Sequence, residues 1–306
     1  MMSSILVIGG TGNIGQHLVT ASLDAGHPTA VLVRPTTVAY DSGRARLLKA
    51  LKARGATLVY LGDGDQRAWG GGDLCRWTRQ IGGAGRPANI IQAVKEAAGY
   101  VKRFLPSEFG CDVEHAERTL EPAKTMIASK LRVRRAIRDA GIPRTFICSN
   151  WAIGLFLSRL IDFGENEPLT AGVNIFGDDK AQAVFVDEKD MSMLAIRAVE
   201  DPRTLDKVLY VRPPTNMRSF SQLIHILEKK TGRTLERHYV SEHEFAKNIQ
   251  EAPFPLNFQL AMVHSTVVHA GACEDAIDAA VGVEATLLYP DVEFITVEEY
   301  LDGLLP

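Results

Sequence analysis

The chain has 306 residues, of which 46% are hydrophobic, and a formal net charge of −3. This length allows one large α/β domain or two small ones, and the nearly balanced charge gives no indication of a protein that binds nucleic acid or a membrane surface. No apolar run reaches the roughly 18 residues of a membrane span, and the N-terminus lacks the features of a signal peptide. The four cysteines are spaced too widely to predict a metal site. We therefore expect a cytoplasmic protein with reduced thiols and no metal.

Apolar strands and amphipathic helices alternate along the first half of the chain. The expected strands are 5–8, 29–35, 56–63, 101–110 and 144–151, and the expected helices are 16–26, 45–55, 89–99 and 130–141. Alternation of this kind is typical of βαβ units around a parallel sheet. We predict an α/β protein whose residues 1–150 form a Rossmann core that binds a dinucleotide.

The second half of the chain has a less regular pattern. Residues 151–306 are expected to be mainly a smaller substrate-binding part, with strands returning to the core near 183–187 and 207–212. The segment VFVDEKD (184–190) is expected to continue the first of these strands, and 219–232 and 242–270 are expected to be helical.

A glycine motif follows the first expected strand and opens the first helix. It reads G-x-G-x-x-G and consists of Gly10, Thr11, Gly12, Asn13, Ile14 and Gly15. Glycines here permit a tight turn and let the backbone approach a pyrophosphate at the helix N-terminus. The alternative is a plain glycine turn, which the strand–turn–helix context disfavours.

The end of the second strand indicates which dinucleotide is bound. An acidic residue at this point would hold a ribose 2′-hydroxyl, but the chain has Arg34 there and Arg44 shortly after. A guanidinium group suits a 2′-phosphate. The sequence therefore favours NADPH over NADH as cofactor, with solvated surface arginines as the alternative.

A catalytic base is harder to predict from the residues alone. None of the tyrosines is followed four residues later by a lysine, so the Tyr-x-x-x-Lys pair of short-chain dehydrogenases is absent. Lys130 and Arg134 are four residues apart and share a helix face, with Arg132 and Arg135 nearby. A lysine among other cations, partly desolvated, can serve as a base. By residue type alone, a solvated basic helix face is the favoured interpretation.

Seven segments together resemble the isoflavone reductase-like family, an NmrA-like branch of the short-chain dehydrogenases. They are VIGGTGNIG, GHPTAVLVRP, VKRFLPSEFG, KLRVRRAI, FVDEKD, VRPPTN and VEATLLYPDV, in the family's order. The resemblance covers nearly the whole chain except about 64–88. It implies that Lys130 is the general base and that Arg134 contacts the cofactor. It also places the glycine loop, Arg34 and Arg44 in the NADPH site.

The resemblance implies reduction of a plant phenylpropanoid, lignan or flavonoid. Lys130 would deprotonate a phenol, a leaving group would depart to give a quinone methide, and NADPH would supply a hydride. The second hypothesis is a catalytically impaired NmrA-like regulator that binds NADP(H). The expected partners are a small aromatic substrate and, as an open alternative, a second copy of the chain in a homodimer. The substrate itself is not identified by the sequence.

Three further residues are implied in the site by the same resemblance. His264 aligns with a histidine that lines the substrate pocket, although a lone histidine on an apolar helix is also a common structural residue. Asn150 is expected above the nicotinamide, with a turn or cap as the alternative. Trp151 departs from the smaller or thioether side chains of relatives, so the substrate of any one relative does not transfer directly.

Residues 69–87, WGGGDLCRWTRQIGGAGRP, have no apolar period and replace the family's fourth strand. The codons that can encode Gly71–Thr78, read one nucleotide later, permit V-V-I-C-A-V-G, which is similar to that strand. We hypothesise that 71–87 is translated out of frame, and we expect 64–87 to be irregular, with at most a short strand. A functional glycine-rich insert is the weaker alternative, because no G-K-[ST] follows it.

Overall fold

The structure, a computed structural model, describes most of the chain. The described residues are 2–34, 41–60, 73–76, 86–97, 99–116, 118–162, 173–176, 181–268 and 276–304. Only the backbone is described at 73–76, 86–88, 158–162, 176 and 266–268. Predictions that concern 64–72 and 77–85 therefore lie outside the described residues.

Two parallel sheets, joined side by side at their edge strands, organise the fold. The first contains β1 (Ile5–Ile8), β2 (Thr29–Val33), β3 (Thr57–Tyr60), β4 (Asp73–Arg76) and β5 (Phe104–Leu105), in the order β3-β2-β1-β4-β5. The second contains β6 (Thr145–Cys148), β10 (Lys207–Tyr210) and β13 (Gly282–Glu284), in the order β13-β10-β6. A parallel bridge between Phe104 and Arg144 joins them. This order is that of a doubly wound sheet, and the predicted α/β fold with a parallel sheet is confirmed.

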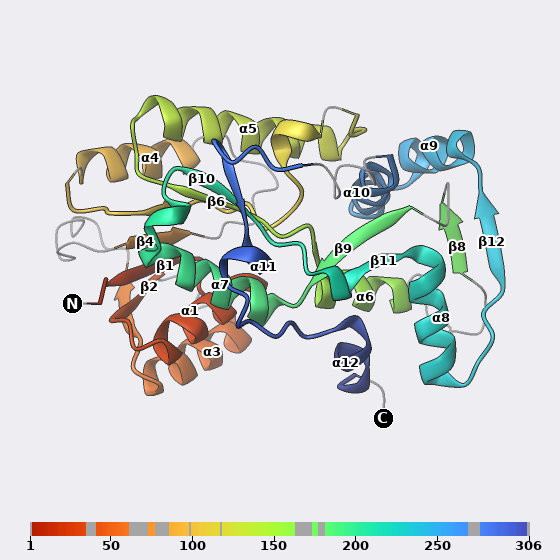
Figure 1. Cartoon of the computed structure of the whole chain (residues 1–306), viewed down its shortest axis with the longest axis horizontal. Coiled ribbons are helices and arrows are strands. Elements are labelled where there is room, and N and C mark those ends of the chain that lie inside the picture. Colours follow the sequence, from red (N-terminus) through yellow and green to blue (C-terminus); the bar gives the residue numbers. More distant parts are fainter. Residues whose placement is uncertain are drawn as a thin grey trace.

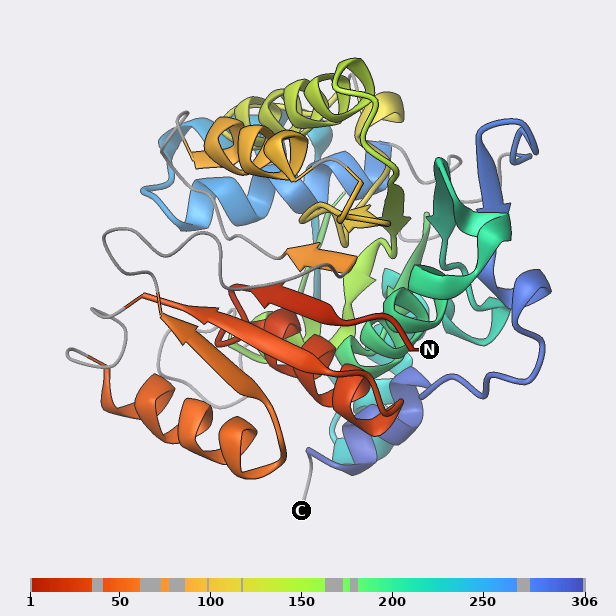
Figure 2. The ribbon, with the colours of Figure 1, turned by 90° about the vertical axis from the view of Figure 1, so that its left-hand side faces the viewer.

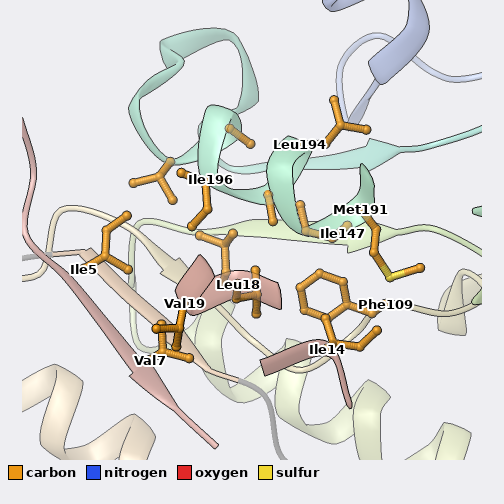
Figure 3. Packing of buried hydrophobic residues seen from close by; sticks show 14 of the residues in the cluster. Ile5, Val7, Ile14, Leu18, Val19, Phe109, Ile147, Met191, Leu194 and Ile196 are labelled. Atoms are coloured by element: carbon orange, nitrogen blue, oxygen red, sulfur yellow. The ribbon is translucent and has the colours of Figure 1, made fainter. Parts of the chain in front are cut away.

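Helices cover both faces of the sheet (Figures 1 and 2). One face carries α1 (Asn13–Asp24), α3 (Ser42–Ala53) and α7 (Glu188–Glu200), and the other carries α4 (Arg86–Glu96) and α5 (Ala123–Asp139). Figure 3 shows Leu18 of α1, Ile147 of β6 and Leu194 of α7 together in the first of these layers, where all three are fully buried. Burial of aliphatic side chains of this size contributes roughly 1.5–3 kcal/mol each.

The strand predicted through residue 190 ends earlier. Strand β9 (Gln182–Val186) stops at Val186, and Asp187 caps helix α7 by accepting a hydrogen bond from the backbone N–H of Lys189 at 2.7 Å. Glu188 and Asp190 follow in the first turn of the helix, where negative charge complements the helix dipole. The prediction that 187–190 is strand is therefore wrong, because these acidic residues begin a helix.

The second half of the chain adds smaller sheets and helices. Strands β7 (Trp151–Ala152), β9 and β11 (Met217–Ser219) form one sheet, and β8 (Val173–Phe176) pairs with β12 (Arg237–Val240). The helices are α6 (Ile153–Asp162), α8 (Phe220–Thr231), α9 (Glu242–Glu251), α10 (Leu256–Val268), α11 (Ala285–Leu288) and α12 (Val297–Asp302), with 3-10 turns at Val113–His115, Pro202–Thr204 and Pro214–Asn216.

Strand β9 lies between the two parts of the fold. Val184 and Val186 enter the core next to α1, whereas Ala183 and Phe185 enter the core of the second half, as expected for alternating strand residues. Strand β10 pairs directly with β6, so the segment near 207–212 extends the parallel sheet. Within the described residues, no helix is both long and apolar enough to cross a membrane.

A short strand is present where the sequence departs from its expected pattern. The backbone of β4 pairs with β1 on one side, with Asp73 opposite Ile5 and Arg76 opposite Ile8, and with β5 on the other. The sequence analysis allowed a strand of this length at most. Its central position in a parallel sheet is one that natural proteins usually fill with apolar residues.

Candidate functional site

The predicted site residues of the first half converge at one edge of the sheet. The glycine loop follows β1, Arg34 follows β2, residues 106–110 follow β5, and Asn150 follows β6. Because these strands belong to parallel sheets joined side by side, their carboxyl ends face the same edge. This edge is where open α/β sheets bind ligands.

The glycine loop is packed too tightly for larger residues. A Cβ atom at Gly15 would lie 2.1 Å from the carbonyl oxygen of Gly9, and one at Gly10 would lie 2.8 Å from Val31. The N-cap of α1 is Gly12, which has no side chain that could cap the helix. The first turn of α1 thus presents backbone N–H groups to the edge of the sheet, an arrangement that suits an anionic group.

Two arginines flank this loop. Arg34 is exposed at the end of β2 and forms no ion pair with any residue that the structure describes. Arg44 lies in the first turn of α3, where its backbone N–H donates to Asp41 at 2.9 Å and its Nε lies 3.3 Å from the Asp41 carboxylate. Of the two, Arg34 is therefore the guanidinium left without a carboxylate partner among the described residues.

Lys130 lies half-buried on α5 and contacts the loop after β5. Its Nζ donates to the backbone carbonyl oxygen of Glu108 at 2.7 Å, and a Cβ atom on Gly110 would lie 3.8 Å from the same Nζ. Arg132 and Arg135, its sequence neighbours, are exposed. The solvated basic face that the sequence favoured thus describes these arginines, whereas Lys130 faces the sheet edge.

The loops after β5 and β6, near Lys130, have an unusual backbone. Phe109 and Asn150 both have positive φ angles, of 44° and 55°, which non-glycine residues rarely adopt. The N–H of Phe109 donates to Ile147 and the N–H of Asn150 donates to Gly110. The side chain of Phe109 lies in the core beside Ile14 (Figure 3). Strain of this kind clusters at functional sites when the surroundings enforce it.

Arg134 occupies a different place from the predicted one. Its side chain has no exposed surface and forms ion pairs with Glu108 at 2.9 Å, Asp112 at 2.7 Å and Glu114 at 3.1 Å. Its guanidinium also lies over the Phe146 ring, 4.8 Å from the centroid. The prediction that Arg134 contacts the cofactor is corrected on this ground, because a fully buried guanidinium committed to three carboxylates has no surface to offer.

Sequence reasoning missed the residues that pair with Arg134. Burial lowers the pKa of Arg134, but the carboxylates of Glu108 and Asp112 outweigh this effect and raise it. Burial and a hydrogen bond to Asp112 raise the pKa of Tyr210, which donates to Asp112 Oδ2 at 2.5 Å. No spacing in the sequence links these groups, since residues 108–112, 134 and 210 meet only in the folded chain.

One other candidate base near Lys130 is made ineffective by burial. Cys111 follows Gly110 in the same loop, and burial, together with the charges of Glu108 and Asp112, raises the pKa of its thiol, although Lys130 opposes the shift. A thiol with a raised pKa stays protonated near neutral pH. Lys130, which contacts this loop from α5, is therefore the candidate base of the site.

His264 lies on α10 in the second half of the chain. It is 5% exposed, its ring packs edge-on against Phe245 with centroids 5.4 Å apart, and its Nδ1 has no hydrogen-bond partner among the described residues. Burial lowers its pKa, although Glu242 opposes the shift. The adjacent Ser265 bonds to Thr119 at 2.8 Å, which attaches α10 to the segment before α5.

A family model confirms the resemblance. The model of the NmrA-like family matches residues 1–73 and 83–301. The chain belongs to the NmrA-like family. The gap between the two matched segments, residues 74–82, falls within the stretch that the sequence analysis singled out.

Individual relatives place the chain within a branch of this family. It is 45% identical to phenylcoumaran benzylic ether reductase Betv6 of Betula pendula, over 98% of the chain and 97% of the relative. A crystal structure of isoflavone reductase covers all of both chains with a TM-score of 0.89 and 36% identity. The complex of leucoanthocyanidin reductase with NADPH from Vitis vinifera covers 98% of each, with a TM-score of 0.85 and 34% identity. The chain is an oxidoreductase of the isoflavone reductase-like family.

Proposed function

We propose that this chain is an NADPH-dependent reductase of a small plant phenylpropanoid, lignan or flavonoid, with Lys130 as its general base. The observation that carries the proposal is the position of the Lys130 ammonium. It is half-buried at the carboxyl edge of the sheet and held 2.7 Å from the Glu108 carbonyl. The relatives are reductases of this class of compounds.

The residues at the sheet edge fit a dinucleotide phosphate. The first turn of α1 offers N–H groups without a side-chain cap among the described residues, and the contact of Gly15 with Gly9 leaves no room for a Cβ. Arg34, exposed and without a carboxylate partner in the described part of the chain, would hold a 2′-phosphate, with Arg44 as a second cation. When bound, NADPH supplies the hydride for reduction.

Lys130 would carry out the proton transfer. A neutral Nζ accepts the proton of a substrate phenol, and the electron pair of the phenolate breaks the bond to a leaving group on the benzylic or allylic carbon. The carbon so exposed is an electrophile that can be reduced. The Glu108 carbonyl accepts a hydrogen bond from Nζ and fixes its position throughout. Asn150, held by its N–H bond to Gly110, is proposed beside the nicotinamide.

The second half of the chain would hold the substrate. His264 is proposed to line the pocket, because its buried Nδ1 lacks a protein partner in the described residues and its lowered pKa keeps it neutral. Trp151 packs edge-on against Phe156, with centroids 4.9 Å apart, and would limit the pocket next to Asn150. The cytoplasm as compartment and a homodimer as assembly stay predictions from the sequence.

Replacement of Lys130 tests the proposed function. Lys130→Ala should lower kcat on a phenolic substrate by about 10²- to 10⁴-fold, the usual contribution of a general base. Binding of NADPH, measured by the quenching of protein fluorescence, should stay within about twofold, because the phosphate-binding residues are untouched. Arg132→Ala, on the exposed side of the same helix, is the matched control. Unchanged turnover in Lys130→Ala would overturn the role of this residue.

The regulator hypothesis has one observation in its favour. The unmatched residues 74–82 overlap β4, whose backbone pairs with β1 directly beside the glycine loop. A chain that binds NADPH but reduces no phenolic substrate, with or without Lys130, would support a regulator. We also keep the proposal that 71–87 is translated out of frame, and sequencing of the transcript across this region tests it.

A further inference from the structure

A continuous series of polar contacts, buried at the Arg134–Glu108 pair, connects strand β10 to Lys130. Tyr210, the last residue of β10, donates to one oxygen of Asp112, and Arg134 donates to the other oxygen at 2.7 Å. The second terminal nitrogen of Arg134 donates to the side chain of Glu108 at 2.9 Å. The backbone carbonyl oxygen of Glu108 accepts a hydrogen bond from the Nζ of Lys130. Four contacts therefore join the hydroxyl of Tyr210 to the Nζ of Lys130.

Burial holds the side chains at the centre of this series in one arrangement. The side chains of Arg134, Glu108 and Asp112 are 0%, 2% and 9% exposed, so their charges have little access to water. A planar guanidinium that bridges two carboxylates fixes both of them in direction as well as in distance. Since Glu108 is held by its side chain, its carbonyl oxygen is held too, and that oxygen is the one that Lys130 contacts.

Tyr210 and Arg138 lie at opposite ends of this network. On the solvent side of the network, Arg138 pairs with Glu114, and this contact lowers the pKa of Glu114 to about 2. Glu114 therefore stays charged and paired. Tyr210 approaches Asp112 from the other side, with its ring packed where a Cβ on Gly282 would come within 2.6 Å of it. The ring is therefore fixed by packing, and the hydroxyl alone makes the contact with Asp112.

We propose that Tyr210 is a positioning residue for the reductase reaction, acting through Asp112, Arg134 and Glu108 to hold the carbonyl that orients Lys130. This inference rests on the proposed function only in the role that it gives to Lys130. Loss of the Tyr210 hydroxyl frees one oxygen of Asp112, lets Arg134 shift, and loosens the Glu108 carbonyl. The Lys130 ammonium then loses its fixed position without any change in the residues that bind NADPH.

The chain offers a matched pair of tyrosines for the test. Tyr289 also donates its hydroxyl to a partly buried aspartate, Asp201, at 3.1 Å, and it too has a pKa raised by burial and by its aspartate. No contact described for it leads to Lys130. Tyr210→Phe and Tyr289→Phe each remove one hydroxyl and keep the ring, so both variants should fold and lose similar stability.

The first measurement needs no substrate. Wild type and both variants are treated with a small amine-acylating reagent, and the acylation rate of Lys130 is followed by mass spectrometry. Tyr210→Phe should raise this rate by about threefold to tenfold, the range expected from loss of one hydrogen bond, whereas Tyr289→Phe should match wild type. Arg134→Lys, which keeps the charge but loses the planar fork, should raise the rate as well. Equal rates in all four proteins would overturn the inference.

The second measurement separates this inference from the proposed function. With a phenolic substrate, Tyr210→Phe should lower kcat by about threefold to tenfold and leave KM and NADPH affinity unchanged. Tyr289→Phe should leave kcat, KM and NADPH affinity as they are in wild type. A changed acylation rate in a protein that shows no turnover at all would keep the positioning network and reject the reductase. Normal turnover with an unchanged acylation rate in Tyr210→Phe would keep the reductase and reject the positioning network.

Discussion

Two regions of the sheet contrast in how well the sequence suits the structure. Around Lys130, side chains that enter the interior are matched to their surroundings, as in the ion pairs of Arg134 and the packing of Phe109 beside Ile14. In β4, a four-residue strand occupies a central place between β1 and β5 with the sequence Asp-Leu-Cys-Arg. The contacts around Lys130 are thus present in a sheet whose strand β4 lacks the usual apolar composition.

The contrast separates two requirements. The catalytic edge needs particular polar groups at particular distances, and these groups come from β5, α5, β6 and β10. The sheet needs continuous backbone pairing, and β4 provides it through its register with Ile5 and Ile8. Backbone pairing does not depend on side-chain identity, but stability does, since central parallel strands are buried on both faces. We therefore expect changes in β4 to alter stability, whereas changes in the Lys130 region alter activity and, where they open the buried ion pairs, stability as well.

The largest effect is expected from opening the buried ionic network. Arg134→Met leaves the carboxylates of Glu108 and Asp112 buried without their cation, which should cost about 3–5 kcal/mol of unfolding free energy. Arg132→Met, an exposed change two residues earlier on the same helix, should cost less than about 0.5 kcal/mol. Urea denaturation of both variants measures the difference. Equal stability would show that Arg134 is not held as the structure describes.

The comparison is sharpened by repairing the weaker region. Replacement of residues 71–77 by Val-Val-Ile-Cys-Ala-Val-Gly should raise the unfolding free energy by about 2–4 kcal/mol, the gain from burying one or two aliphatic side chains. Thermal unfolding of the two proteins side by side measures it. The reverse outcome, a less stable repaired protein, would mean that β4 is adapted to its present sequence and that the frame hypothesis is wrong.

A third comparison is between a glycine that is tightly packed in the glycine loop and one that is not. Gly15→Ala places a Cβ where the Gly9 carbonyl lies, at 2.1 Å, so the turn must move and the affinity for NADPH should fall by about tenfold or more, equivalent to 1.4 kcal/mol. Gly43→Ala, in the first turn of α3 with only an Asp41 oxygen at 3.4 Å, should leave affinity unchanged. Equal affinities in isothermal titration would reject the loop as the phosphate site.

The dependence of stability on pH gives a further test. Burial raises the pKa of Asp190 to about 6, against the N–H that Ile295 donates to it at 2.7 Å. An acid whose folded pKa lies above its unfolded value of 3.8 favours folding most at low pH, and this contribution is lost as pH rises from about 4 to about 6. Asp190→Asn should therefore be about as stable as wild type at pH 4 and about 2–3 kcal/mol more stable at pH 7. A melting-temperature series from pH 4 to pH 8 would reveal this, and a constant difference across the series would contradict it.

Much of the fold could be predicted because local patterns carry it. Apolar runs such as Ile5–Ile8 and the glycine loop between strand and helix are written in adjacent residues, and so is the arginine at the end of β2. The acidic start of α7 was missed because Asp187 and Glu188 follow a strand without a break. The strand prediction could have been stopped there, since aspartate is a strong N-cap residue.

The site was only partly predictable for a physical reason. Lys130 was identified through the resemblance, and its exposed neighbours could be recognised by residue type. The burial of Arg134 could not be predicted, because it depends on Glu108 and Asp112, which are distant in sequence, and on Tyr210, which is further still. A side chain's charge is visible in the sequence, but its access to solvent is decided by tertiary contacts.

The central claim is that the cofactor edge is intact and selects NADPH although β4 departs from the family pattern. Titration of the protein with NADPH and with NADH, followed by fluorescence, tests it most directly, with Arg34→Ala as the companion variant. We predict that wild type binds NADPH at least tenfold more tightly than NADH, and that Arg34→Ala loses about 1.5–3 kcal/mol of NADPH binding only, the strength of a hydrogen bond to a charged group. Equal affinities for the two cofactors, or no binding of either, would contradict the account.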